Sequence, residues 1–147
     1  MNAQEILATV PLFSGVKERY LANLARQCRE RSFKSGDTVV RQGNPGEGLF
    51  VIVSGRVRVE KHMEDGAVVV IANHGPGDVI GEMSVLDGAT RSASVVAESD
   101  TECLVLVSWD FNAFLKSHPE VALDILPVVV KRFRETNEAL LQLKSGA

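Results

Sequence analysis

Residues 77–97 read GDVIGEMSVLDGATRSASVVA. This pattern predicts a glycine turn, a short helical segment after Gly81, a second glycine turn at Gly88 and a strand that starts near Arg91. Glycine at position 81 lets the backbone approach a ligand closely, and the N–H groups that open the helical segment favour an anion. Arg91 adds a planar cation that can bind two phosphate oxygens at once. We therefore predict a phosphate-binding site in this stretch.

Glu82 lies inside the predicted anion site and needs its own explanation. A carboxylate fits there if the ligand carries a sugar, because a ribose 2′-hydroxyl can donate to it while the phosphate binds Arg91. Each residue also has an ordinary explanation: the helix dipole alone favours Glu82, Arg91 could be a surface charge, and the glycines could be plain turns. Gly-Glu followed nine residues later by Arg-Ser is better explained by a sugar phosphate than by chance.

The chain on both sides of this stretch has the pattern of β-structure. Ten of the twelve glycines fall between Gly36 and Gly88, where they separate short apolar or alternating runs. Asp65-Gly66 is the signal of a two-residue hairpin turn. The runs are residues 38–41, 49–53, 56–61, 67–72, 94–97 and 102–107. Many short strands at near-regular spacing predict a sandwich, a barrel or a jelly roll.

The N-terminal residues predict helices. A short apolar turn within residues 4–10 is followed by a break at Pro11 and Gly15, and residues 20–28 then repeat apolar side chains at helical spacing. The first ten residues have neither a basic head nor a long apolar core, so they do not form a signal peptide. We therefore expect a cytoplasmic protein.

The C-terminal residues also predict helices. Residues 109–117 form one short helix in this interpretation, and Pro119 is a favourable first residue for the next. Pro127 lacks an N–H group, so we expect the second helix to kink or restart there. An apolar seam at three- and four-residue steps follows Leu126, Val129, Phe133, Thr136, Leu140 and Leu143. The seam either covers the chain's own β-domain or pairs with the same helix of a second copy, and both can hold for different halves.

Composition excludes several classes of protein. The 147 residues suit one domain, and 16 basic against 19 acidic residues give a net charge of −3, which provides no general attraction to nucleic acid or to an anionic membrane. Uninterrupted apolar runs are at most six residues long, whereas a membrane span needs about twenty. Cys28 and Cys103 lie outside any metal-binding spacing, and we expect two reduced, buried thiols rather than a disulfide.

The sequence also gives little support for catalysis. His62, His74 and His118 are scattered, with no spacing typical of a metal site. The serines lie in no nucleophile motif, and two cysteines are too few for an iron–sulfur cluster. We predict no catalytic residue, no bound metal and no cofactor.

Residues 77–97 resemble the phosphate-binding cassette of cyclic nucleotide-binding domains, which occur in bacterial cyclic AMP receptor proteins and in regulatory subunits of cyclic nucleotide-dependent kinases. The resemblance extends to Pro11-Leu12-Phe13 before a helix, to 34–37 and 42–43 as the family's first strands, and to the hydrophobic run and glycine of 49–57. It implies a mainly β fold with flanking helices: a β-roll or jelly roll with an N-terminal helical segment and a C-terminal helical lid. We expect one domain over 1–147, with N-terminal helices in 1–30, a β-roll in 31–108 that contains the cassette at 77–97, and C-terminal helices in 109–147.

The resemblance also implies a role for each cassette residue. Glu82 would accept the ribose 2′-hydroxyl, and Arg91 would pair with the cyclic phosphate. Ser92 would offer a hydroxyl or amide to the phosphate, or to a guanine in some members. Gly81, Met83 and Ser84 would line the phosphate pocket. Members that have lost ligand binding usually lack the glutamate or the arginine, and both are present here.

The nucleotide base is expected to contact the long C-terminal helix. In the bacterial receptors a pair of hydroxyls on that helix reaches adenine, and the matching positions here are Thr136 and Asn137. Asn137 departs from the pattern, so the resemblance leaves the choice between cyclic AMP and cyclic GMP open, with cyclic AMP favoured. Thr136 is explained equally well as a tolerated polar residue in a packed helix.

The family's transcription regulators continue into a helix-turn-helix domain, and nothing in this chain resembles one. The basic residues Lys131, Arg132 and Arg134 adjoin Glu135 and Glu138, which predicts a solvated helix face and no direct DNA binding. We therefore expect a regulatory module that signals to a partner protein or through a homodimer formed by the C-terminal helix. The alternatives are a structural or interaction domain with a vestigial pocket, and a jelly-roll enzyme with an unrecognised metal site.

Overall fold

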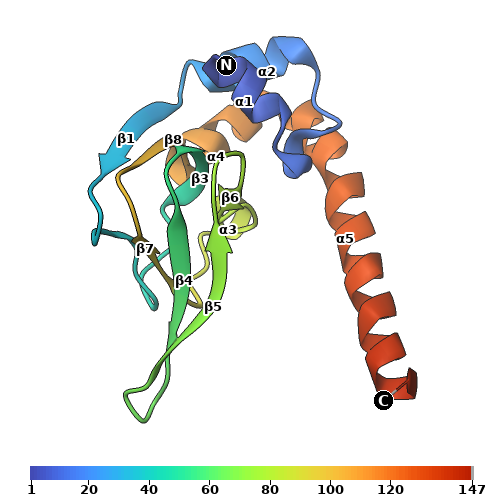
Figure 1. Cartoon of the computed structure of the whole chain (residues 1–147). Helices are drawn as coiled ribbons and strands as arrows, with labels where there is room; N and C mark the ends of the chain where they lie inside the picture. Colours follow the sequence, from blue (N-terminus) through green and yellow to red (C-terminus); the bar gives the residue numbers. More distant parts are fainter. Residues whose placement is uncertain (147) are drawn as a thin grey trace.

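Two four-stranded antiparallel sheets form the body of the computed structural model, which describes residues 1–146 (Figure 1). The first sheet has the order β1 (Arg29–Phe33), β8 (Thr101–Val107), β3 (Gly48–Ser54), β6 (Val79–Ile80). The second has the order β2 (Thr38–Val40), β7 (Ser94–Ala97), β4 (Val57–His62), β5 (Val68–His74). Neighbouring strands are mostly distant in the sequence, as in a jelly roll. The predicted fold class is confirmed.

Helices cover one end of the two sheets. They are α1 (Ala3–Ala8), the 3₁₀ turn η1 (Pro11–Phe13), α2 (Glu18–Ala25), α3 (Ser84–Asp87), α4 (Ser108–Ser117) and α5 (Pro119–Gly146). Figure 1 shows α1, α2 and α4 gathered beside the start of α5, while the rest of α5 projects away from the body. Among residues 1–146, no helix combines the length and apolarity that crossing a membrane requires.

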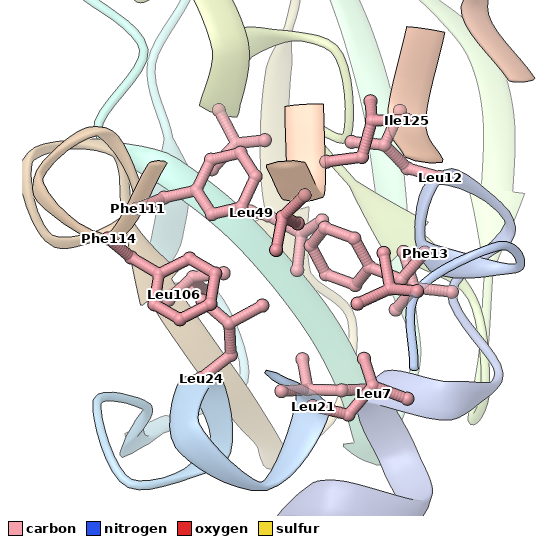
Figure 2. Close-up of a cluster of buried hydrophobic side chains, with 14 of the residues drawn as sticks. Leu7, Leu12, Phe13, Leu21, Leu24, Leu49, Leu106, Phe111, Phe114 and Ile125 are labelled. Carbon is pink, nitrogen blue, oxygen red and sulfur yellow. The ribbon is translucent and has the colours of Figure 1, made fainter. Parts of the chain in front are cut away.

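The continuous apolar run of β3 is explained by burial on both of its faces. Leu49 and Val51 pack in a cluster with the helices, whereas Phe50 and Ile52 pack between the two sheets. This two-residue period is the alternation that a strand imposes on its side chains. Figure 2 shows the helical cluster, in which the rings of Phe13 and Phe111 lie 5.6 Å apart. The N-terminal segment and the C-terminal helices therefore share one core.

Three local predictions need correction. The β4–β5 hairpin turns through residues 63–67, where the Met63 N–H donates to the Ala67 carbonyl, so the loop is longer than a two-residue turn. Residues 34–37 and 42–43 form turns on either side of β2 rather than strands, because the Asp37 carboxylate accepts the Lys34 N–H and the Asn44 N–H donates to the Arg41 carbonyl. The first strand starts at Arg29, two residues before the predicted boundary. Both cysteines are free, Cys103 buried and Cys28 half-buried.

Helix α5 runs without interruption through Pro127, so the predicted restart is wrong. Proline leaves the carbonyl four residues earlier, at Leu123, without its helical partner. Leu123 is exposed, so water can satisfy that carbonyl. Only Val121 and Ile125 of α5 are buried, and Phe133 and Leu143 are 65% and 74% exposed. The body of the chain therefore covers the first turns of α5 and leaves the predicted seam exposed, except for half-buried Val129.

Candidate functional site

A cavity of about 380 Å³ lies beside the loop that carries the predicted phosphate-binding residues. All six of these residues line it: Gly81, Glu82, Met83, Ser84, Arg91 and Ser92. The opposite wall is apolar and comes from both sheets, with Val40, Val59, Val79, Ile80 and Val95. The cavity thus combines a polar end suited to a sugar phosphate with an apolar wall suited to a flat base.

Glycines shape the polar end. Gly81 has φ +72°, and a side-chain carbon placed there would overlap Nη1 of Arg91. Gly88, with φ +63°, ends the single turn of α3 and donates its N–H to the Ser84 carbonyl at 2.8 Å. Both values favour glycine, because a Cβ atom strains this region of φ. At Gly81 the close approach of Arg91 is a second reason.

The loop before β3 holds this polar end in place. The Arg91 N–H donates to the Asn44 carbonyl and the Gly43 N–H donates to the Arg91 carbonyl, both at 2.8 Å. The Gly46 N–H donates to the Ala89 carbonyl at 3.0 Å. A Cβ atom on Gly46 would lie 2.8 Å from both the Ala89 carbonyl oxygen and the Ser84 Cβ. This ladder fixes the backbone around Arg91 before any ligand arrives.

Arg91 is a buried cation whose donors are incompletely used. Arg91 is 8% exposed, and its Nη2 donates to the Gly48 carbonyl at 2.6 Å. Its Nε atom is buried and has no hydrogen-bond partner among residues 1–146. Burial lowers the pKa of Arg91, an effect opposed by the nearby charge of Glu47, yet a guanidinium stays charged at neutral pH. A buried charged donor without an acceptor is the strongest sign of an anionic ligand in this molecule.

The Glu82 carboxylate is already engaged. Its side chain is 15% exposed, and its Oε1 atom accepts the Leu12 N–H at 2.6 Å and Arg132 Nη2 at 2.8 Å. Arg132 comes from α5 and also lines the cavity. The prediction that Arg132 belongs to a solvated face is therefore wrong for this residue. No sequence signal distinguished Arg132, because its partner Glu82 lies 50 residues away in the chain.

Two further findings concern the cavity walls. His74, at the end of β5, lines the cavity and lies 3.4 Å from the Asp78 carboxylate, and nothing in the sequence pattern singled it out. The predicted base contacts Thr136 and Asn137 are exposed on α5, and neither is among the residues that line the cavity. Their contact with a base stays a prediction.

Comparison with known proteins agrees with this geometry. The model of the family "Cyclic nucleotide-binding domain" matches residues 30–118. The Mycobacterium tuberculosis "CRP-like cAMP-activated global transcriptional regulator" is 31% identical over 139 residues, which cover 95% of this chain and 62% of that protein. The Thermus thermophilus "Cyclic AMP receptor protein" is 35% identical over 127 residues, which cover 86% of this chain and 59% of that protein.

The fold is also similar to that of solved structures. The crystal structure of the N-terminal domain of a Streptomyces coelicolor transcriptional regulator matches with a TM-score of 0.82 and 33% identity, covering 92% of this chain and 94% of that one. The chain spans about three-fifths of the length of the two curated relatives. On the match over residues 30–118 and these similarities, the chain belongs to the cyclic nucleotide-binding domain family, whose members are regulatory modules.

Proposed function

We propose that this chain binds a cyclic nucleotide, cyclic AMP in preference to cyclic GMP, in the cavity beside the cassette at residues 77–97. The observation that carries the proposal is the buried guanidinium of Arg91 with its unpartnered Nε. The preference for cyclic AMP is supported by the names of the two curated relatives, a cAMP-activated regulator and a cyclic AMP receptor protein.

Each cassette residue has a role in the proposed complex. Arg91 pairs with the cyclic phosphate, and the backbone of Gly81, Met83 and Ser84 lines the phosphate pocket together with Ser92. Glu82 accepts the ribose 2′-hydroxyl. The valines of the apolar wall face the base, and Thr136 and Asn137 reach the base only if α5 or a second copy of it moves over the cavity.

Signalling would pass through α5. Arg132 connects α5 directly to Glu82, so a ligand that changes the surroundings of Glu82 also changes the position that α5 prefers. The nucleotide shifts α5 only by the difference between its affinities for the two arrangements. We propose neither a catalytic activity nor a direct contact between residues 1–147 and DNA. A cytoplasmic location stays a prediction.

The receiver of the signal is proposed to be a second copy or a partner protein. The seam of α5 beyond its first turns is exposed, and β5 at the edge of its sheet exposes Val68, Val69, Val70 and Ile71. Apolar surfaces of this extent on a soluble chain mark association sites. A homodimer through α5 would bury the seam and bring each Thr136 toward a nucleotide site.

Calorimetric titration of the purified chain with cyclic AMP, cyclic GMP and a cyclic dinucleotide tests the proposal. We expect one site per chain, the highest affinity for cyclic AMP, and no binding of the dinucleotide. Equal affinity for cyclic AMP and cyclic GMP would remove the base preference and leave the site. If no nucleotide binds, the alternative of an interaction domain with a vestigial pocket replaces this function.

A further inference from the structure

We infer that the N-terminal 3₁₀ turn is part of the ribose subsite, because the backbone N–H of Leu12 positions the Glu82 carboxylate. This inference rests on the proposed function and deepens it: it assigns ribose discrimination to a segment 70 residues away in the sequence. Leu12 is a positioning residue that does not touch the ligand. Its side chain packs in the core, and its amide N–H donates to the Glu82 carboxylate.

The two donors to Glu82 meet on the same oxygen. Leu12 N and Arg132 Nη2 lie 2.6 Å and 2.8 Å from Oε1, and they come from opposite ends of the chain. The second oxygen, Oε2, accepts no hydrogen bond from residues 1–146, and Glu82 lines the cavity. With Oε1 held from two directions, rotation of the carboxylate is restricted. Oε2 is the oxygen left to accept a hydroxyl.

The Leu12 amide is itself held rigidly. The Leu12 side chain is fully buried in the helical core, where Figure 2 shows it next to Ile125 of α5. Hydrogen bonds from Phe13 N to the Val10 carbonyl at 2.9 Å and from Ser14 N to the Pro11 carbonyl at 3.1 Å close the 3₁₀ turn. A donor fixed by the core is a better anchor than a flexible side chain, since no rotamer freedom is lost when it binds.

The expected consequence is selectivity for a ribonucleotide over its 2′-deoxy analogue. A carboxylate already aligned toward the 2′-hydroxyl gains the full charge-assisted hydrogen bond, while a freely rotating one first loses entropy. The opposite effect is also conceivable physically: the Leu12 and Arg132 donors could compete with the ribose for the carboxylate. In that case their removal strengthens binding of the ribonucleotide, so the two accounts predict opposite signs.

The test replaces the Leu12 amide by an ester, using the α-hydroxy analogue of leucine so that the buried side chain is kept. An ester at Val16 is the matched control, because it removes a nearby N–H that bonds to the Phe13 carbonyl and belongs neither to the two bonds closing the 3₁₀ turn nor to the contacts of Glu82. The measured quantity is the ratio of the dissociation constants of 2′-deoxy cyclic AMP and cyclic AMP. A ratio cancels any general loss of folded protein.

We expect the Leu12 ester to lower this ratio about fivefold, the size of one ordinary net hydrogen-bond contribution, and the Val16 ester to leave it unchanged. In the free protein, Glu82→Gln should move the Leu12 amide proton signal upfield, since the acceptor loses its charge. An unchanged or increased ratio in the Leu12 ester overturns the inference but not the nucleotide site. Absence of nucleotide binding by the wild type overturns the proposed function and, with it, the ribose role.

Discussion

The cassette and the outer half of α5 are opposite kinds of surface. The cassette backbone is fixed by the loop at residues 43–48 and by glycine contacts, and of the two ionic cassette residues that line the cavity, Arg91 is buried and Glu82 half-buried. The outer half of α5 keeps Phe133, Leu140 and Leu143 in solvent and touches little of the chain that carries it. The first region is formed within one chain. For the second region, we propose that another protein surface covers the exposed seam.

The two regions are joined through Arg132, which pairs with the Glu82 carboxylate and also donates to the Met83 sulfur at 3.6 Å. Partly buried pairs of this kind couple elements because separating them leaves a charge without its partner. Under the proposed function, nucleotide binding and the position of α5 would therefore be linked through the Glu82 carboxylate. The comparison predicts that changes in the cassette act mainly on affinity, whereas changes in outer α5 act mainly on association.

The largest effect is expected from Arg91→Leu. This change removes the only cation that lies within the cassette, so the cyclic phosphate enters the cavity without a charge partner. The fold should persist, and nucleotide affinity should fall by about 2–5 kcal/mol. Calorimetry with cyclic AMP measures the loss, and circular dichroism checks the fold. Unchanged affinity in a folded variant would show that the cassette is not the binding site.

The next effect concerns the space that Arg91 occupies. In Gly81→Ala the new methyl group overlaps the guanidinium, which must move away from the phosphate position. We expect an affinity loss of about 1–3 kcal/mol, because the displaced guanidinium no longer makes its hydrogen bonds to the phosphate. Gly77→Ala is the matched control, because Gly77 also has a positive φ but has no atom within 4 Å of the added carbon.

Both alanine variants should lose similar stability, about 1–2 kcal/mol from the strained φ, so thermal unfolding should not separate them. Nucleotide affinity should separate them, because only the methyl group of Gly81→Ala displaces Arg91. If Gly77→Ala weakens binding as much as Gly81→Ala, backbone strain rather than the Arg91 contact explains the result.

Removal of the ribose 2′-hydroxyl is expected to lower nucleotide affinity by a comparable or smaller amount. Wild-type protein should bind 2′-deoxy cyclic AMP more weakly than cyclic AMP by about 1–3 kcal/mol, because the Glu82 oxygen is left without a donor. In Glu82→Gln the difference should shrink. Competition binding with a fluorescent nucleotide gives both values in one assay. Equal wild-type affinities would mean that the carboxylate serves only Leu12 and Arg132.

The smallest effect on affinity is expected in outer α5. Leu140→Lys combined with Leu143→Lys places two charges on the seam and should convert a homodimer into a monomer in sedimentation at micromolar concentration. Nucleotide affinity should change by no more than about 1 kcal/mol, the low end of typical coupling. Gln142→Lys with Ser145→Lys adds the same charge at polar positions and should stay dimeric. A wild-type monomer, with and without nucleotide, would end the homodimer proposal.

Local pattern predicted the helices, six of the eight strands and the cassette residues Gly81, Glu82 and Arg91, because each follows from spacing or from a glycine turn. Met83, Ser84 and Ser92 came from the family resemblance. Arg132 could not be recognised, since its partner Glu82 lies 50 residues away and only the tertiary fold brings the two together. The role of the Leu12 amide could not be predicted either. Every residue except proline carries an N–H group, so no sequence pattern distinguishes this one. The continuity of helix α5 through Pro127 could not be predicted, because the sequence does not show that Leu123 is exposed.

The most direct test of the central claim is an amide spectrum of the isotope-labelled chain during titration with cyclic AMP. We predict saturable, equimolar shifts of the signals of Gly81–Ser84 and of Arg91 and Ser92, a change at Leu12, and little change at Gly77. Signals of Leu140–Leu143 should move only if association changes with binding. Saturable shifts elsewhere with a silent cassette, or no shifts at all at millimolar nucleotide, would contradict the claim that this cassette holds a cyclic nucleotide.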